Sequence, residues 1–247
     1  MTASSDLGMG EKAISKAAEA AVESLLTDVQ DLQVAIETDP IKLAKGEVDR
    51  LKVEGKGIVA KGELRTESLS LDAKDIDVDM LKAAAGSFEL EQPAEAAAQV
   101  TLTAKDIEKA FNADYVKKKL RGEKVTLPSG DRATLDVSDM QFTFPSAGEA
   151  HLLATVMLIE KVEKSSVGFS CEPKLAQNGR KITLENVQPD EASADEEAIA
   201  HALADCIGAL LDFDRFDLNN MDFQFNQLAV EPGKMMLSGS AQIESFD

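Results

Sequence analysis

Hydrophobic residues recur at helical spacing in three stretches of the chain. The clearest stretch follows Ser193, where apolar residues return every three or four positions as far as Leu211. Ser193 and Glu196 match a capping box, in which the serine hydroxyl accepts an N–H of the first turn and the glutamate reaches back. Weaker stripes predict a helix over about residues 11–27 and a continuous helix over about residues 104–120.

The predicted middle helix carries signals at both ends. Thr103 is suited to the N-cap position, with Asp106 three residues further on. Three lysines at positions 117–119 fall in its last turn, where positive charge meets the negative end of the helix dipole. Gly122 then favours termination of the helix.

Between the helical stretches the apolar spacing changes to every second residue, which is typical of strands with one buried face. The alternating segments are residues 32–36, 69–71, 76–80, 100–102, 140–144, 152–159, 221–225 and 236–243. Turn-forming residues separate several of them, at 128–131, 177–179 and 231–233. Helices and strands do not alternate one for one, which disfavours parallel βαβ units. The pattern predicts an α+β fold in which a strongly bent antiparallel sheet wraps around long amphipathic helices.

A weak internal similarity bears on the domain organisation. A helix leads into the alternating segment 31–36, and the helix after Ser193 leads into the segment 221–225. We expect one domain over residues 1–247, and the echo leaves open a division into two helix-plus-meander halves of about 9–122 and 123–247.

The charge of the chain excludes one class of function. Forty-five Asp and Glu residues against 26 Lys and Arg give a net charge of −19, the opposite sign from a nucleic-acid binder. A hydrophobic content of 44% can sustain a core, which disfavours disorder. No stretch approaches the roughly 18–20 apolar residues that span a bilayer, and residues 1–11 lack the pattern of a secretory signal. We therefore expect a cytoplasmic protein, with peripheral contact to an internal membrane left open.

Catalytic motifs are missing from the sequence. His151 and His201 lie in no metal-ligand spacing, and neither a GxSxG elbow nor a phosphate-binding glycine loop is present. Cys171 and Cys206 have no CxxC partner, so reduced thiols are the better expectation, with a disulfide left open. We expect no catalytic residue, no bound metal and no cofactor.

Three alternating aspartates begin like a calcium-binding loop. Asp75, Asp77 and Asp79 have the right spacing, but Met80 stands at the sixth position and Gly86 at the twelfth. An EF-hand needs glycine and glutamate there. The aspartates are better interpreted as the solvated face of a strand.

A bent sheet that closes only partly on its helices leaves an apolar groove suited to acyl chains. The residues expected to line it are Ile14, Ala18, Leu25, Ile107, Phe111, Leu203, Ile207, Leu210, Phe223 and Phe225. Two basic clusters are candidates for docking to anionic head groups, with ordinary solvated charge as the alternative. Their members are Lys42 and Lys45 in one and Lys117, Lys118, Lys119 and Arg121 in the other.

The segment between residues 14 and 120 also carries a family resemblance. Its features are a turn glycine at Gly46, glycines at Gly55 and Gly57, and the box Val100-Thr101-Leu102-Thr103-Ala104-Lys105-Asp106-Ile107 that opens a helix. In order and spacing they resemble the LmeA-like phospholipid-binding family of bacteria, common in cyanobacteria and actinobacteria. The resemblance implies a tubular lipid-binding (TULIP-like) fold that holds phospholipid acyl chains between helix and sheet, with no catalytic residues to carry over.

Two functions remain as hypotheses. The first is non-enzymatic binding, extending to transfer, of a phospholipid or other acyl lipid, with transient docking to a membrane surface. The second is a protein-interaction or membrane-complex assembly factor that has kept the fold with a filled groove, as the high negative charge would suit charge-steered partners.

Overall fold

The chain forms two compact units. The computed structural model describes residues 15–16, 18–20, 22–23, 26–59, 65–79, 89–176, 178–190, 193–212 and 221–245. Unit 1 comprises Met1–Thr101, Asp217–Asn226 and Ser238–Asp247, and unit 2 comprises Leu102–Phe216 and Gln227–Leu237. Strands β4, β10 and β11, whose bounds are given below, therefore contribute residues to both units. The expectation of one domain with two sequential halves stays a prediction.

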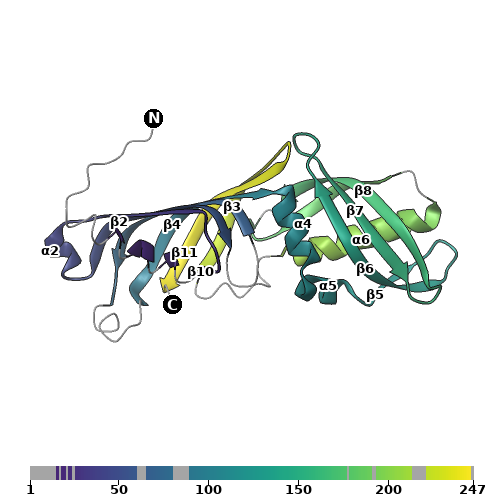
Figure 1. The fold of residues 1–247 in the computed structure, drawn as a ribbon, viewed down its shortest axis with the longest axis horizontal. Helices are drawn as coiled ribbons and strands as arrows, with labels where there is room; N and C mark the ends of the chain where they lie inside the picture. The colour runs from purple at the N-terminus through teal and green to yellow at the C-terminus, as the bar shows by residue number, and fades with distance from the viewer. Residues whose placement is uncertain are drawn as a thin grey trace. The chain divides into compact units, whose positions relative to one another are not determined.

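Unit 1 is built on a six-stranded sheet with the order β1-β2-β3-β4-β11-β10. The strands are β1 (Asp31–Glu37), β2 (Glu47–Val59), β3 (Arg65–Asp77), β4 (Glu89–Thr103), β10 (Met221–Glu231) and β11 (Lys234–Ser245). The ladders from β1 to β4 are antiparallel, and the sheet is strongly curled (Figure 1). A one-turn helix, α2 (Pro40–Leu43), connects β1 to β2.

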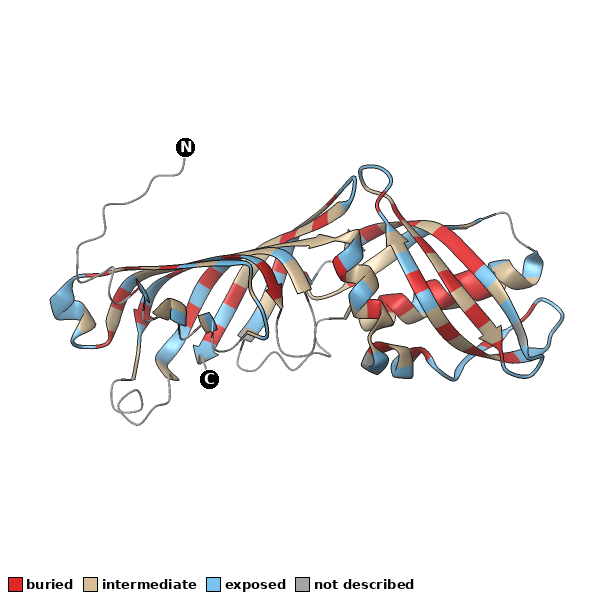
Figure 2. Cartoon of the chain, in the orientation of Figure 1, coloured by how far each residue is buried: buried red, intermediate tan, exposed pale blue. Residues whose placement is uncertain are grey.

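Unit 2 contains a five-stranded antiparallel sheet whose order follows the sequence. Its strands are β5 (Glu123–Thr126), β6 (Arg132–Thr143), β7 (Ala150–Leu158), β8 (Glu163–Leu175) and β9 (Ile182–Pro189). Three helices accompany it: α4 (Ala104–Asn112), α5 (Asp114–Leu120) and α6 (Ala194–Leu210). Helix α6 packs against β5, β8 and β9, and Figure 2 shows its buried positions along with the alternating burial of the strands.

Three residues with left-handed backbone bend the strands. Asp75, Asp139 and Asn186 have φ of 52°, 49° and 50°. The β6–β7 and β8–β9 ladders each shift register by a bulge, the first directly at Asp139. Asp and Asn tolerate this conformation better than other non-glycine residues, and a bulge increases the local bend and twist of a strand. Each of these two bulges therefore contains an Asp or Asn that tolerates the left-handed conformation.

The predicted capping box at Ser193 and the predicted N-cap at Thr103 are confirmed, and Thr103 also forms a capping box with Asp106. The Thr103 N–H donates to Asp106 Oδ2 over 2.9 Å, and the Asp106 N–H donates to Thr103 Oγ1 over 3.2 Å. At the start of α6, the Ser193 N–H donates to Glu196 Oε2 over 2.8 Å. That backbone hydrogen bond, with a second one from the serine hydroxyl, lowers the pKa of Glu196. The helix starts are thus fixed by local chemistry that the sequence reveals.

The prediction of a continuous middle helix is wrong. The helix breaks at Ala113, whose backbone is extended with ψ of 142°, and divides into α4 and α5. The physical reason is the side chain of Asn112. Its amide donates to the carbonyl of Met140 over 2.6 Å and accepts from the Met140 N–H over 3.1 Å. Asn112 thereby satisfies backbone groups beside the bulge in β6, and this contact ties down the end of α4.

The α+β class and the bent, mostly antiparallel sheet are confirmed, but long amphipathic helices are not. Among the described residues, α6 has 17 residues and no other named helix exceeds nine. Of the helix expected over residues 11–27, the described residues between 15 and 23 are helical, and the remaining positions up to 25 lie outside the described residues. Leu26 and Thr27 are not helical.

Two glycines allow a matched test of the packing. A Cβ added at Gly239 in β11 would overlap the carbonyl oxygen of Gln224 and lie 2.6 Å from Cα of Phe225 in β10, whereas a Cβ at Gly208 in α6 meets nothing within 4 Å. We expect Gly239→Ala to lower the free energy of unfolding by about 1–3 kcal/mol. Gly208→Ala should raise it by up to about 1 kcal/mol, because alanine is the better helix former. Urea denaturation of both variants measures the difference, and equal effects would contradict the described backbone packing.

Candidate functional site

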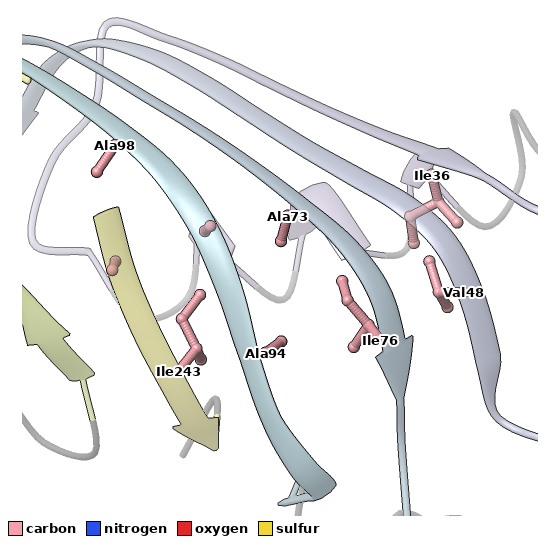
Figure 3. Close-up of a cluster of buried hydrophobic side chains, with 9 residues drawn as sticks. Ile36, Val48, Ala73, Ile76, Ala94, Ala98 and Ile243 are labelled. Atoms are coloured by element: carbon pink, nitrogen blue, oxygen red, sulfur yellow. The ribbon is translucent and has the colours of Figure 1, made fainter. Parts of the chain in front are cut away.

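The inner face of the curled sheet in unit 1 is apolar and built largely from small side chains. Its buried cluster comprises Ile36, Val48, Ala73, Ile76, Ala94, Ala96, Ala98, Ala241 and Ile243. Five of these nine residues are alanines, so most side chains of the cluster are short. We call this cluster the alanine wall. Figure 3 shows the labelled members on one side of strands β1 to β4 and β11, within the curve of the sheet.

Strand β4 shows how the sequence builds this wall. Ala94, Ala96 and Ala98 point inward and are at most 4% exposed. The residues between them, Glu95 and Ala97, are exposed on the other face. Side chains alternate strictly between the two faces of a strand, so the Ala-x-Ala-x-Ala spacing lines the inner face with methyl groups. An alanine wall leaves more space above the sheet than leucine or phenylalanine would.

Partly buried apolar residues surround the cluster. They are Ala18, Leu43, Leu51, Leu71, Val78, Leu90 and Phe223. Ala18 is one of the helical residues described between 15 and 23, so this helical segment lies against the same sheet. Ser15, from the same stretch, is 6% exposed and accepts the Ile36 N–H over 2.9 Å. The helix is thus attached to the edge strand β1 by a buried hydrogen bond.

Unit 2 has a different core. Of the eleven largest side chains that are almost completely buried among the described residues, ten belong to unit 2, and Ile243 belongs to unit 1. Leu203 and Ile207 of α6 are both 1% exposed and pack onto its sheet. Large side chains at this degree of burial fill an interior to native density. Unit 2 therefore has a packed core, whereas unit 1 has the alanine wall.

The outer face of the unit 1 sheet is polar and charged. Arg50 donates two hydrogen bonds to Asp72, from Nε over 2.8 Å and from a terminal nitrogen over 2.5 Å. Lys42 Nζ lies 2.6 Å from Asp49 Oδ1. These hydrogen bonds lower the pKa of Asp72 and of Asp49. The charged residues described here thus make the outer face hydrophilic, whereas the alanine wall lies on the opposite face of the same sheet.

The predicted lining residues fall into two groups, one in each unit. Unit 1 holds Ala18, Phe223 and Phe225, and unit 2 holds Ile107, Phe111, Leu203, Ile207 and Leu210. In unit 1 the rings of Phe223 and Phe225 stack with centroids 6.1 Å apart. In unit 2 Phe111 contacts Phe142 at a centroid distance of 4.9 Å. Ile14 and Leu25 lie outside the described residues. That these side chains line a lipid groove stays a prediction.

The predicted docking residues lie at three places. Lys42 is in α2 and Lys45 in the turn after it, beside Ile41, whose side chain is 71% exposed. Lys117, Lys118 and Lys119 form the last turn of α5. Arg121 follows that helix and lies 3.2 Å from Asp136. Of the predicted docking residues, only Lys42 and Lys45 lie beside one of the large apolar side chains that are exposed among the described residues.

Sequence reasoning missed the alanine wall. Ala73, Ala94, Ala96, Ala98 and Ala241 were not among the expected lining residues. Alanine is weakly apolar and also occupies the outer position 97, so the hydrophobic pattern over 94–98 shows no clear alternation. The usable signal was the run of small residues in a segment next to the strand at 100–102.

The described residues show no cluster for catalysis. No group of three potential metal-ligating side chains is found among them. His151 Nε2 lies 3.1 Å from Asp190 Oδ2, without a nucleophile in the pair. Burial raises the pKa of Cys171 to about 12 and that of Cys206 to about 11, which keeps both thiols protonated. No described helix is long and apolar enough to cross a membrane.

Comparison with known proteins gives one match. A family model described as LmeA-like phospholipid-binding matches residues 7–240 of the 247. No curated protein and no solved structure matches significantly. The resemblance first noted over residues 14–120 is thereby confirmed and extends over nearly the whole chain.

The raised thiol pKa values predict slow alkylation. At pH 8 a thiol with a pKa near 11 is about 0.1% thiolate, against roughly a quarter for an unperturbed cysteine. We expect Cys206 of the folded protein to react with iodoacetamide at least tenfold more slowly than after unfolding in urea, and Cys171 more slowly still. Mass spectrometry of timed samples measures both rates. A fast reaction of either thiol in the folded state would contradict the described burial.

Proposed function

This chain belongs to the LmeA-like phospholipid-binding family, and we propose that it binds a phospholipid without catalysis and holds the acyl part against the alanine wall of unit 1. The observation that supports this proposal most directly is the alanine wall, in which five of nine buried apolar residues inside a curled sheet are alanines. An acyl chain gains about 0.8 kcal/mol for each CH₂ removed from water, so a long apolar wall suffices for binding.

The contrast between the units supports this placement. In unit 2 the space above the sheet is occupied by Leu203, Ile207 and other fully buried side chains. In unit 1 the short helix between residues 15 and 23 contributes Ala18, another small side chain. The space between small side chains on both elements is the place where an acyl chain can lie without displacing a packed core.

We further propose that the protein transfers its bound phospholipid between membranes. A carrier must admit and release its lipid, which requires one covering element to move. The helix between residues 15 and 23 suits this role, because its described polar attachment to the sheet is the hydrogen bond from Ile36 to Ser15. This hydrogen bond contributes about 1 kcal/mol, which opening of the segment would have to offset together with the packing of Ala18.

Membrane docking is proposed at the α2 cluster, comprising Ile41, Lys42 and Lys45. Ile41 is 71% exposed at the tip of the β1–β2 connection, where its side chain can enter the head-group region of a bilayer. The lysines beside it can meet anionic head groups. Because the whole chain carries a charge of −19, we propose that contact with an anionic membrane is brief and depends on salt.

The alternative function is a protein-interaction or assembly factor, and one observation favours it. Val162, in the turn between β7 and β8, is 79% exposed and has φ of 56°. This left-handed conformation is costly for a β-branched residue, and Ile159 in the same turn is 48% exposed. An apolar turn on a packed unit suits contact with a protein. Under this alternative, purified protein takes up no phospholipid.

Filling the alanine wall should block uptake. Ala96→Leu adds an isobutyl group in the middle of the wall, and we expect uptake of a fluorescent phosphatidylcholine from vesicles to fall at least fivefold. The stability of the lipid-free protein should fall by about 1–3 kcal/mol, because Ala96 is fully buried and the larger side chain must displace its neighbours. Fluorescence dequenching measures uptake, and urea denaturation measures stability.

The matched control is Ala97→Leu, which places the same side chain on the outer face of the same strand. It should leave uptake unchanged. Equal uptake by Ala96→Leu, Ala97→Leu and the unmodified protein would exclude the wall as the acyl site. Absence of uptake by the unmodified protein would favour the interaction function instead.

Removing the exposed side chain of α2 should weaken docking. We expect Ile41→Asp to reduce co-sedimentation with phosphatidylglycerol vesicles at least fivefold, because insertion of an isoleucine contributes up to about 1.5–3 kcal/mol. Lys45→Glu should also reduce it and should make the remaining binding less sensitive to salt.

Lys118→Glu in α5 is the control for charge alone. It makes the same change of net charge in unit 2 and should leave co-sedimentation within twofold of the unmodified protein. If Lys118→Glu releases the protein while Ile41→Asp does not, docking belongs to the α5 lysines and the proposal for α2 is wrong.

A further inference from the structure

Helix α2 connects the proposed docking site with one end of the alanine wall. Its two large apolar side chains lie in different surroundings, because Leu43 packs against the wall whereas Ile41 is 71% exposed. The helix joins the end of β1 to the start of β2 at one end of the sheet of unit 1 (Figure 1). Val48 and Ile76, which pair across β2 and β3, are the wall residues at that end. One turn of helix thus carries both the side chain proposed for membrane contact and a side chain that packs on the wall.

This turn is anchored to the sheet on both sides. Before it, the Thr38 hydroxyl donates to the carbonyl of Glu47 over 3.0 Å. After it, the carbonyl of Gly46 accepts the Val78 N–H over 2.9 Å, and Gly46 has φ of 90°. Residues 39–45 between the anchors are shaped by hydrogen bonds within the turn. The turn can therefore move as one piece while both anchors stay in place, because a glycine at its end tolerates the change of backbone angles.

An exposed ion pair fastens the turn to β2. Lys42 Nζ lies 2.6 Å from Asp49 Oδ1, and both side chains are nearly half exposed. We call this pair the latch. A pair at this exposure is weak in water and is screened by salt. An anionic membrane surface attracts lysine, so its phosphate groups compete with the Asp49 carboxylate for Lys42.

The same end of β1 also holds the helical segment described between residues 15 and 23. The Ile36 N–H of β1 donates to Ser15 of that segment, and α2 begins shortly afterwards at Pro40. A movement of α2 therefore acts on the strand to which the segment is attached.

From these contacts we infer that α2 is a gate at the end of the wall, which opens when an anionic membrane takes Lys42 from Asp49 and Ile41 enters the bilayer. Leu43 then leaves the wall with the turn and makes room for an acyl chain. The inference rests on the proposed function and adds its regulation, because the wall is closed in water and opens at the membrane.

Locking the turn tests the gate. Lys42→Cys with Asp49→Cys keeps the net charge, and a short bis-methanethiosulfonate reagent links the two thiols until dithiothreitol removes the link. We expect the linked protein to take up fluorescent phosphatidylcholine from vesicles containing phosphatidylglycerol about fivefold more slowly than the same protein after reduction. Its co-sedimentation with these vesicles should stay within about twofold, because Ile41 and Lys45 remain exposed.

The matched control link lies on the outer face of the same two strands. Glu54→Cys and Ser70→Cys replace register partners in β2 and β3, so the same reagent can join them. This link should leave uptake unchanged.

Releasing the latch should have the opposite effect on uptake. Asp49→Asn removes the charged partner of Lys42, and uptake from vesicles of pure phosphatidylcholine should become faster by about two- to fivefold, the range of one exposed ion pair. Glu54→Gln makes the same change of net charge on an exposed side chain of the same strand and should leave this uptake unchanged. Neutral vesicles are used so that net charge alone does not alter docking.

Four results would overturn the gate while leaving lipid binding intact. They are equal uptake by the linked and the reduced protein, equal slowing by the control link, a loss of co-sedimentation as large as the loss of uptake, and equal uptake by Asp49→Asn and Glu54→Gln. The third result would assign the slower uptake to docking alone. If the unmodified protein takes up no phospholipid, the proposed function fails, and the inference fails with it.

Discussion

The curl of the six-stranded sheet is the constraint on which unit 1 depends. Strands of 13 to 15 residues expose their apolar face to water wherever the sheet bends the wrong way or the alternation slips by one residue. Left-handed backbone at Asp75 corrects the alternation within β3, so that Ala73 and Ile76 are both buried with two exposed residues between them. Gly57 does the same in β2. The bend and the continuous inner face therefore arise at the same positions.

The two units use related secondary structure for different ends. Unit 2 fills the space over its sheet with helix α6, whose side chains are almost completely buried. Unit 1 lines its sheet with alanines, and Ser15 of the helical segment described between residues 15 and 23 accepts a hydrogen bond from β1. Large buried side chains fill the interior of unit 2, whereas the alanines of unit 1 occupy less volume above their sheet. This contrast is the reason why we propose unit 1, rather than unit 2, as the lipid-binding unit.

The sequence was most informative where structure is fixed by neighbouring residues. The capping boxes at Thr103 and Ser193 were predictable because cap and partner are three residues apart. The break after Asn112 was not, because its cause is a pair of hydrogen bonds to Met140, 28 residues away. Strand β9 was missed because the bulge at Asn186 interrupts its alternation. For the site, aromatic and branched residues drew attention, whereas the wall consists of alanines that also occur on outer faces.

The placement of charge decides what the site can select. The acidic excess lies outside the core: Asp106 is the one fully buried charged residue among those described, and it belongs to unit 2. A phosphate drawn into unit 1 would thus meet no described buried cation, and burying it unpaired would cost far more than the acyl chain gains. Under the proposed function, the head group therefore remains in water. Selection then falls, under the same proposal, to the uncharged acyl part of the lipid, packed against the alanines.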